Sequence, residues 1–192
     1  MAQERPAVPT RPPVFLGCAA AFGFLVVAVA GAAFAIAFLE SGADTGRVEL
    51  EQAEAYAPNS VSFVSSRNLY VVRARDGTFF ALSDLDAANR ANPGRQCRVS
   101  AVNRNDPDFE KLLSQYASQF SERAAGMDVL FREGCNNALY DATGLRLNSE
   151  DEPNLDRYPV TVSSRGLVEV NLAVRQCTQR ASDELFAAID CP

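Results

Sequence analysis

Residues 69–82 read LYVVRARDGTFFAL and decide the fold class. Two apolar runs, rich in β-branched and aromatic side chains, flank the dipeptide Asp76-Gly77. An Asp-Gly pair between such runs is typical of a tight turn, because the central turn positions take positive φ values. The stretch therefore predicts a β-hairpin, and similar short runs elsewhere predict a mainly β fold. The other expected strands are 61–64, 97–102, 127–132, 139–141, 158–162 and 167–172.

Residues 106–126 break this pattern and predict an inserted α-helix. Asp106 suits the N-cap, Pro107 suits the first helical position, and Gly126 suits the residue after the helix. The apolar residues between them recur at helical spacing, on one face. We expect this face to pack on the sheet; a partner-binding face is the alternative. It consists of Phe109, Leu112, Leu113, Tyr116 and Phe120.

The segments around these elements are less regular. Residues 48–57 fit a short helix or an extended lead-in, ended by Pro58-Asn59-Ser60. Two polar stretches, 83–96 and 145–156, are expected to be loops, with the acidic residues 150–152 solvated. A short amphipathic helix is expected at 181–189.

The N-terminal run from Val14 to Leu39 contains no charged residue. It exceeds the roughly 20 residues that a helix needs to cross a bilayer, so it predicts an uncleaved transmembrane anchor. A signal peptide cleaved at 33–35 and a lipoprotein modified at Cys18 are the alternatives. Basic residues precede the run and acidic residues follow it, which favours a cytoplasmic N-terminus.

This anchor implies a single-pass protein of the cell membrane, with its larger part on the periplasmic or extracellular side. The expected organisation is a Pro-rich cytoplasmic tail (1–13), the transmembrane helix (14–39), a linker (40–59), the outer domain (60–175) and a C-terminal tail with a short helix (176–192).

Composition excludes several functions. The chain has no histidine, which excludes Ser-His-Asp and Cys-His catalysis, His-ligated zinc and c-type haem. Its net charge of −6 argues against nucleic-acid binding, which favours a basic surface. The spacing of the acidic residues singles out no pair for general acid–base work, so we do not expect an enzyme.

The order of the motifs resembles that of a Rieske iron–sulfur domain. The hairpin ends in Ala81-Leu82-Ser83-Asp84, a loop with a cysteine follows, and Cys135 stands shortly before Tyr140-Asp141-Ala142-Thr143-Gly144. Then come Leu155-Asp156-Arg157-Tyr158-Pro159-Val160 and a closing strand at 166–170. The resemblance covers about 61–172 and implies an antiparallel β-sandwich. A single N-terminal membrane helix is also what the Rieske subunits of quinol–cytochrome c reductases carry.

The resemblance also assigns roles to loop residues. In quinol-oxidising members of the family, each of the two loops has a cysteine that does not bind the cluster, and these two cysteines form a disulfide between the loops. The resemblance places Cys97 and Cys135 at these two positions. The cluster-ligand positions fall on Asn92, Gly94, Glu133 and Asn136. A Rieske cluster needs two cysteine and two histidine ligands, so a chain without histidine cannot hold one. We therefore expect no cofactor and no metal.

Four cysteines lie beyond the anchor: Cys97, Cys135, Cys177 and Cys191. They show no C-x-x-C spacing, and in an oxidising compartment they are expected to form disulfides. Three connectivities are open from the residues alone. The resemblance implies Cys97–Cys135, which leaves Cys177–Cys191.

Two functions fit these observations. The first is a non-redox accessory subunit of a bacterial respiratory or photosynthetic electron-transfer complex. Residues 14–39 would contact membrane-embedded subunits, and the outer domain would contact a soluble cytochrome. The second is a membrane-anchored binding module of the cell envelope, whose surface would be the loops 83–96 and 145–156, since loops often carry binding residues.

Overall fold

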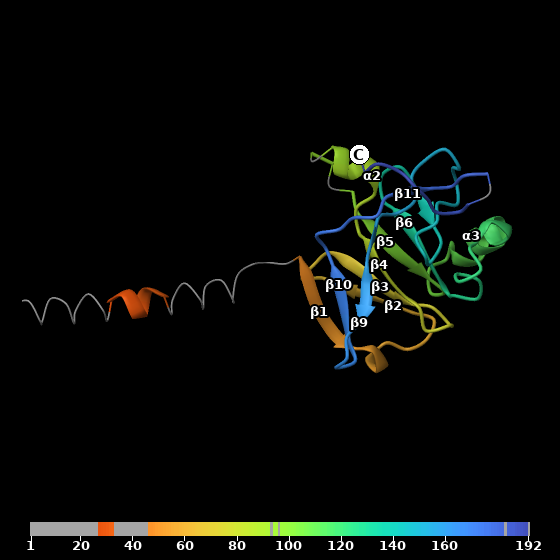
Figure 1. The fold of residues 1–192 in the computed structure, drawn as a ribbon. Coiled ribbons are helices and arrows are strands. Elements are labelled where there is room, and N and C mark those ends of the chain that lie inside the picture. Colours follow the sequence, from red (N-terminus) through yellow and green to blue (C-terminus); the bar gives the residue numbers. More distant parts are fainter. Residues whose placement is uncertain (1–26, 33–45, 93, 96, 183, 192) are drawn as a thin grey trace, which may run out of the picture. The chain divides into compact units, whose positions relative to one another are not determined.

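The structure is a computed structural model that describes residues 27–32, 46–92, 94–95, 97–182 and 184–191 (Figure 1). The chain divides into two units, Met1–Asp44 and Thr45–Pro192. Residues 27–32 of the first unit are helical. The predicted tail (1–13) and most of the predicted anchor (14–39) lie outside the described residues. Within the described ranges, no helix has both the length and the apolar character needed to cross a bilayer.

The second unit is mainly β, as predicted, and all of its strand pairs are antiparallel. The first sheet has the order β1 (Arg47–Gln52), β10 (Leu167–Asn171), β9 (Val160–Val162). The second has the order β2 (Ser60–Val64), β3 (Leu69–Arg73), β4 (Phe79–Ser83), β8 (Arg157–Tyr158). The third has the order β5 (Val99–Asn103), β6 (Val129–Glu133), β7 (Leu139–Tyr140). The strands β11 (Thr178–Gln179) and β12 (Ala187–Ala188) form a separate pair.

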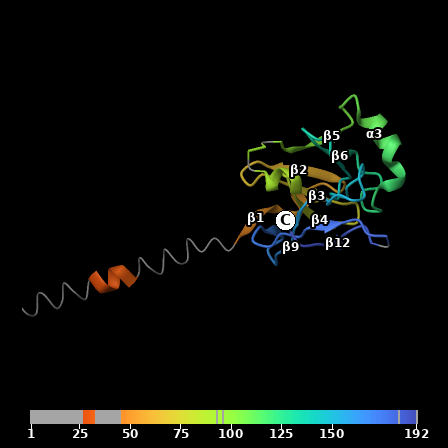
Figure 2. The same cartoon turned by 90° about the horizontal axis from the view of Figure 1, so that it is seen from above.

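The described residues of this unit also form four short helices. They are the 3-10 helices η1 (Ala53–Ala55) and η2 (Ala117–Gln119) and the α-helices α2 (Ala87–Ala91) and α3 (Phe109–Tyr116). In both ribbon views, α3 lies beyond β5 and β6 as seen from β1 (Figures 1 and 2). In Figure 1, α2 lies at the top of the unit.

The predicted hairpin is confirmed as β3 and β4, with Val72 opposite Phe80. Gly77 takes a φ of +84° at the turn. The carboxylate of Asp76 accepts a hydrogen bond from the backbone N–H of Thr78 at 2.9 Å. The turn chemistry that predicted the hairpin therefore also holds it closed.

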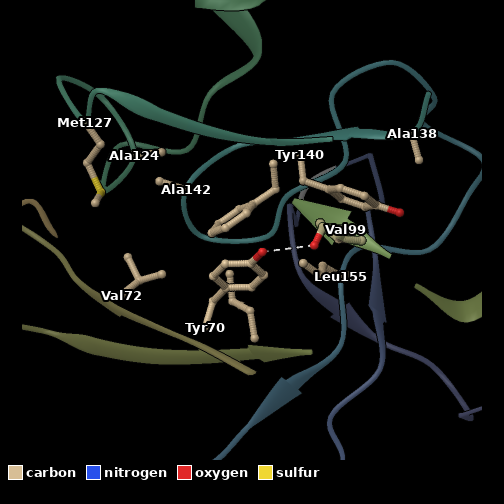
Figure 3. Close-up of a cluster of buried hydrophobic side chains, with 11 residues drawn as sticks. Tyr70, Val72, Val99, Ala124, Met127, Ala138, Tyr140, Ala142 and Leu155 are labelled. Carbon is tan, nitrogen blue, oxygen red and sulfur yellow. Dashed lines mark hydrogen bonds between the residues drawn. The ribbon is translucent and has the colours of Figure 1, made fainter. Parts of the chain in front are cut away.

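The main core cluster lies between the second and third sheets (Figure 3). The hydroxyl of Tyr70 donates to the carbonyl of Val99 at 3.0 Å and so joins β3 to the start of β5. The ring centroids of Tyr70 and Phe131 lie 4.8 Å apart in the same cluster. The buried members are Tyr70, Val72, Leu82, Val99, Ala124, Met127, Phe131, Ala138, Tyr140, Ala142 and Leu155.

The inserted helix is shorter than predicted. Helix α3 begins at Phe109, with Asp108 rather than Asp106 at its N-cap, and ends at Tyr116. Beyond it, Ser121 uses its backbone N–H and its hydroxyl to donate to the buried carboxylate of Asp141, at 2.9 and 2.7 Å. The 3-10 helix η2 lies between α3 and Ser121, and the two bonds fix Ser121 to the loop after β7. The expected packing of the apolar face is confirmed, because its residues join a core cluster with β5, β6 and β7.

Two loop predictions also need correction. For residues 48–57 the extended alternative is confirmed over β1, which η1 follows, so part of the expected linker 40–59 belongs to the first sheet. The expected loop 83–96 contains α2, because the Asp86 carboxylate caps a helical turn by accepting from the N–H of Asn89 at 2.8 Å. In the expected loop 145–156, the residues at 150–152 are exposed, as predicted.

The helix predicted at 181–189 is wrong for the residues described there. Instead, Thr178 of β11 pairs with Ala188 of β12. The backbone N–H of Ile189 donates to the carbonyl of Cys177 at 3.0 Å. Strand pairing satisfies backbone groups that the short helix would have bonded internally. The described part of the expected tail therefore contains the antiparallel pair of β11 with β12.

Candidate functional site

The disulfide Cys97–Cys135 continues the pairing of β5 with β6. Val99 is the β5 residue opposite Glu133 at the end of this ladder. Cys97 lies two residues before Val99, and Cys135 lies two residues after Glu133. The two cysteines therefore face each other, with their Cα atoms 5.8 Å apart. Between them, the N–H of Gly134 donates to the carbonyl of Arg98 at 3.3 Å. The strand register therefore brings the two cysteines together.

Glu133 lies beneath this disulfide and is fully buried. Its carboxylate accepts from the backbone N–H of Cys135 at 2.9 Å and from the N–H of Asn136. It also accepts from Nδ2 of Asn89 at 3.1 Å. A buried charge is costly unless hydrogen bonds satisfy it, and here three N–H donors do so. The loop 134–136 is thus wrapped around the Glu133 carboxylate.

The four residues that the sequence placed at ligand positions lie in or next to the two loops that the disulfide joins. Asn136 is exposed, and its side-chain oxygen accepts from Arg95 at 2.8 Å. Asn92 ends α2, and its Nδ2 donates to the carbonyl of Ala88 at 2.9 Å. Gly94 is exposed. Within the described ranges, Glu133 and Asn136 share a hydrogen bond, whereas Asn92 makes none to loop 134–136.

The disulfide decides what this site can bind. The sulfurs of Cys97 and Cys135 and a carboxylate oxygen of Glu133 lie within 4.8 Å of one another. A cysteine ligates a metal as a thiolate, and these two sulfurs are instead bonded to each other. Only Glu133 then offers a ligand atom. These three residues could hold a soft metal ion only after reduction of the disulfide.

Helix α2 connects this site to a second group of buried polar residues, which the sequence did not reveal. Asn89 donates from Nδ2 to both Asp86, at 2.8 Å, and Glu133. The hydroxyl of Tyr140 lies 3.5 Å from Oδ2 of Asp86 and accepts from Arg146 at 3.0 Å. Burial raises the pKa of Tyr140. Its hydroxyl therefore stays protonated and can donate to Asp86.

The same helix is fixed on its other side by Asp156, which is buried. Arg90 of α2 forms an ion pair with this carboxylate, and Arg175 lies 3.5 Å from it. Burial raises the pKa of Asp156, although both arginines act to lower it. The second disulfide, Cys177–Cys191, closes the chain after Arg175, with its Cα atoms 5.2 Å apart. Both expected disulfides are thus present.

A pocket of about 410 Å³ lies between the two stretches that the sequence marked as polar loops. Residues 86–88, from the first stretch, line one part of it. Residues 146, 152 and 153, from the second, line another. Asn136, Ala138 and Tyr140 complete the lining. We call it the α2 pocket.

A larger pocket of about 790 Å³ contains none of the predicted site residues. The Arg157 guanidinium in its wall lies 3.7 Å from the ring centroid of Phe186 and 5.0 Å from that of Phe80. Burial lowers the pKa of Arg157 to about 10. Its side chain remains a cation at neutral pH and donates to the carbonyl of Thr143. It therefore packs against Phe80 of β4 in the wall of this pocket.

Comparisons with known proteins do not identify the chain: no protein-family model, curated protein or solved structure matches it.

Proposed function

We propose that this protein is a non-redox accessory subunit of a bacterial membrane electron-transfer complex, built on a Rieske-like β-sandwich that has lost its [2Fe–2S] cluster. One observation carries the proposal. The disulfide Cys97–Cys135 joins the two loops that would hold the cluster, and the carboxylate of Glu133 lies beneath it. Loop N–H groups bond to that carboxylate. A disulfide and an internal acceptor would then perform the structural work that a cluster performs between such loops.

The chemistry of the chain supports cluster loss. Rieske irons need two histidine ligands, and the chain has none. A cluster bound by cysteines alone would need four thiolates. The four cysteines beyond the apolar run are paired in two disulfides. An electron-transfer role by a bound iron–sulfur group is therefore not part of the proposal.

What remains is a role in assembly. The apolar run 14–39 would pack against membrane-embedded subunits, where Ala and Gly favour close helix contact. The outer unit would brace neighbouring subunits or guide a soluble cytochrome. A net charge of −6 favours encounter with a basic partner, because complementary charge raises association rates.

Purification from native membranes in a mild detergent tests this proposal. We expect the full chain to co-purify with membrane subunits of an electron-transfer complex, at a mass well above its own 20.7 kDa. Migration alone, at monomer size, contradicts the proposal. Visible absorbance and the electron paramagnetic resonance of the reduced sample should both lack an iron–sulfur signal. Such a signal would contradict cluster loss.

A second candidate is a binding module of the cell envelope. The observation that favours it is the α2 pocket, which the two polar stretches 83–96 and 145–156 line together. Ligand binding in this pocket, by a protein that co-purifies with no membrane subunit, would favour the second candidate over the first.

A further inference from the structure

The α2 pocket contains a buried carboxylate that no cation among the described residues neutralises. Asp86 is 4% exposed and forms no salt bridge within these ranges. Its Oδ1 accepts from the N–H and from Nδ2 of Asn89, both at 2.8 Å. Its Oδ2 receives only the Tyr140 hydroxyl, at 3.5 Å. That distance is too long for a strong hydrogen bond, so Oδ2 can accept from a ligand.

The one arginine in the pocket wall does not supply the missing charge. Arg146 donates from Nε to Asn148 at 2.8 Å and from NH1 to the Tyr140 hydroxyl. Its NH2 forms an ion pair with Glu152 at 2.5 Å. The lining therefore keeps one net negative charge, from Asp86. Glu133, behind Asn89, adds a second buried carboxylate.

Asn89 provides an independent sign of an incomplete polar network. Its side chain is 2% exposed, and its Oδ1 has no hydrogen-bond partner among the described residues. Nδ2 already donates to two carboxylates. Exchanging the oxygen and nitrogen of the amide would set an oxygen against both carboxylates, so the present orientation is the favourable one. Nε and NH2 of Arg90, in the same helix, are also buried without a hydrogen-bond partner among the described residues. Asn89 lies behind Asp86 and does not line the pocket, so the acceptor that a ligand would meet is Oδ2 of Asp86.

We propose that the α2 pocket binds an alkylguanidinium group, with its N–H groups donating to Asp86. Such a cation supplies the missing charge and a donor for Oδ2 of Asp86, and a charged hydrogen bond of this kind is strong. A guanidinium is more weakly hydrated than an ammonium, so it enters a partly apolar pocket at lower cost. The alkyl part would contact Ala87, Ala88 and Pro153, which line the pocket. A volume of about 410 Å³ falls within the range of small-ligand sites.

The group could belong to an arginine side chain of another protein or to a free alkylguanidine. The proposal gives a ligand class to the second candidate function and does not depend on any electron-transfer partner. Its test measures binding to the purified full chain, whereas the first candidate rests on co-purification. The guanidinium proposal and the first candidate function can therefore fail separately.

The experiment titrates the full chain in detergent micelles with agmatine and, separately, with the blocked peptide acetyl-Gly-Gly-Arg-Gly-Gly-amide. Isothermal calorimetry measures both affinities. We expect saturable binding that weakens with added salt, because charge contributes to it. If the peptide binds more tightly than agmatine, the ligand is a protein side chain. If agmatine binds more tightly, the ligand is a free small molecule.

Two variants locate the site. Asp86→Asn keeps an oxygen that can cap α2 and removes the charge, so affinity should fall by about tenfold or more. Ala88→Leu leaves Asp86 in place and fills part of the pocket, and it should also weaken binding. Glu122→Gln removes a carboxylate from the lining of the larger pocket and is the matched control. Its affinity should equal that of the wild type.

Two results would overturn the inference. One is the absence of saturable binding of either probe at millimolar concentration. The other is an affinity that stays unchanged in both Asp86→Asn and Ala88→Leu. Thermal melting of each variant shows whether it is folded, and Ala88→Leu keeps the test valid if Asp86→Asn does not fold, because Ala88 is exposed.

Discussion

Nδ2 of Asn89 donates to Oε1 of Glu133 at 3.1 Å, across 44 positions of sequence. This bond connects α2, which follows the second sheet, to the end of β6 in the third. The same Nδ2 also donates to Asp86 at 2.8 Å. One amide group thus serves two buried carboxylates, so its loss should affect both the helix and the disulfide-linked loop.

Replacing Asn89 with Ala should lower the free energy of unfolding by about 1–3 kcal/mol, because two buried acceptors lose a donor. Urea unfolding followed by circular dichroism measures the change. Asn92→Ala is the control, since Asn92 belongs to the same helix segment and is exposed. Its effect should stay within about 0.5 kcal/mol. Equal losses in the two variants would contradict a special role for Asn89.

Replacing Cys97 with Ser should lower the free energy of unfolding by about 4 kcal/mol in the chain-entropy model, because the cysteines lie 38 residues apart. Cys191→Ser opens a separation of 14 residues and should cost about 3 kcal/mol by the same reasoning. Thermal melting ranks the variants. In a Cys18→Ser background, Cys97→Ser should also expose one newly reactive thiol, at Cys135. An unchanged melting temperature together with no reactive thiol would count against this disulfide.

Local turn chemistry made the centre of the fold predictable. The β3–β4 hairpin follows from the apolar runs around Asp76-Gly77, and those residues hold the turn in the structure. The predicted helix 106–126 is an α-helix only as far as Tyr116, and the 3-10 helix η2 follows it. Beyond η2, the backbone N–H of Ser121 donates to Asp141, which is distant in sequence. Periodicity along the chain cannot register such a long-range bond.

The candidate site was predictable only in part, for a similar reason. The cysteines and Glu133 were found from motif order. Asp86 and Asn89 were missed, because a five-residue helix is too short to show a hydrophobic period. The sequence did contain a capping signal, because an Asp at the N-cap can accept a hydrogen bond from the N–H three residues later. Asp86 accepts in this way from the N–H of Asn89. A search for N-caps inside polar stretches could have located α2.

Two glycines with similar backbone angles should respond differently to Ala. Gly77 has φ +84° with no atom within 4 Å of an added Cβ, so Gly77→Ala should cost about 1–2 kcal/mol from backbone strain alone. Gly144 has φ +86°, and its added Cβ would lie 3.1 Å from Leu82 and 3.3 Å from Leu155. Crowding should raise the cost of Gly144→Ala to about 2–4 kcal/mol. Urea unfolding of both variants tests the order, and a larger loss for Gly77→Ala would contradict the packing around Gly144.

The Asp76 carboxylate should make the hairpin sensitive to acid. The N–H and hydroxyl of Thr78, and more weakly Arg123, hold the pKa of Asp76 below its ordinary value. A carboxyl with a lowered pKa in the folded state stabilises that state above its unfolded pKa. This contribution is lost as pH falls from about 4 through the folded-state pKa. Asp76→Asn cannot ionise, so the stability advantage of the wild type over this variant should shrink across that range.

Urea unfolding of the wild type and of Asp76→Asn at several pH values from neutral to acid measures this difference. Arg123→Gln is the control, because it removes the weaker contribution and leaves both groups of Thr78 in place. Its pH profile should stay close to that of the wild type. A gap between wild type and Asp76→Asn that widens as pH falls would mean that ionised Asp76 destabilises the fold.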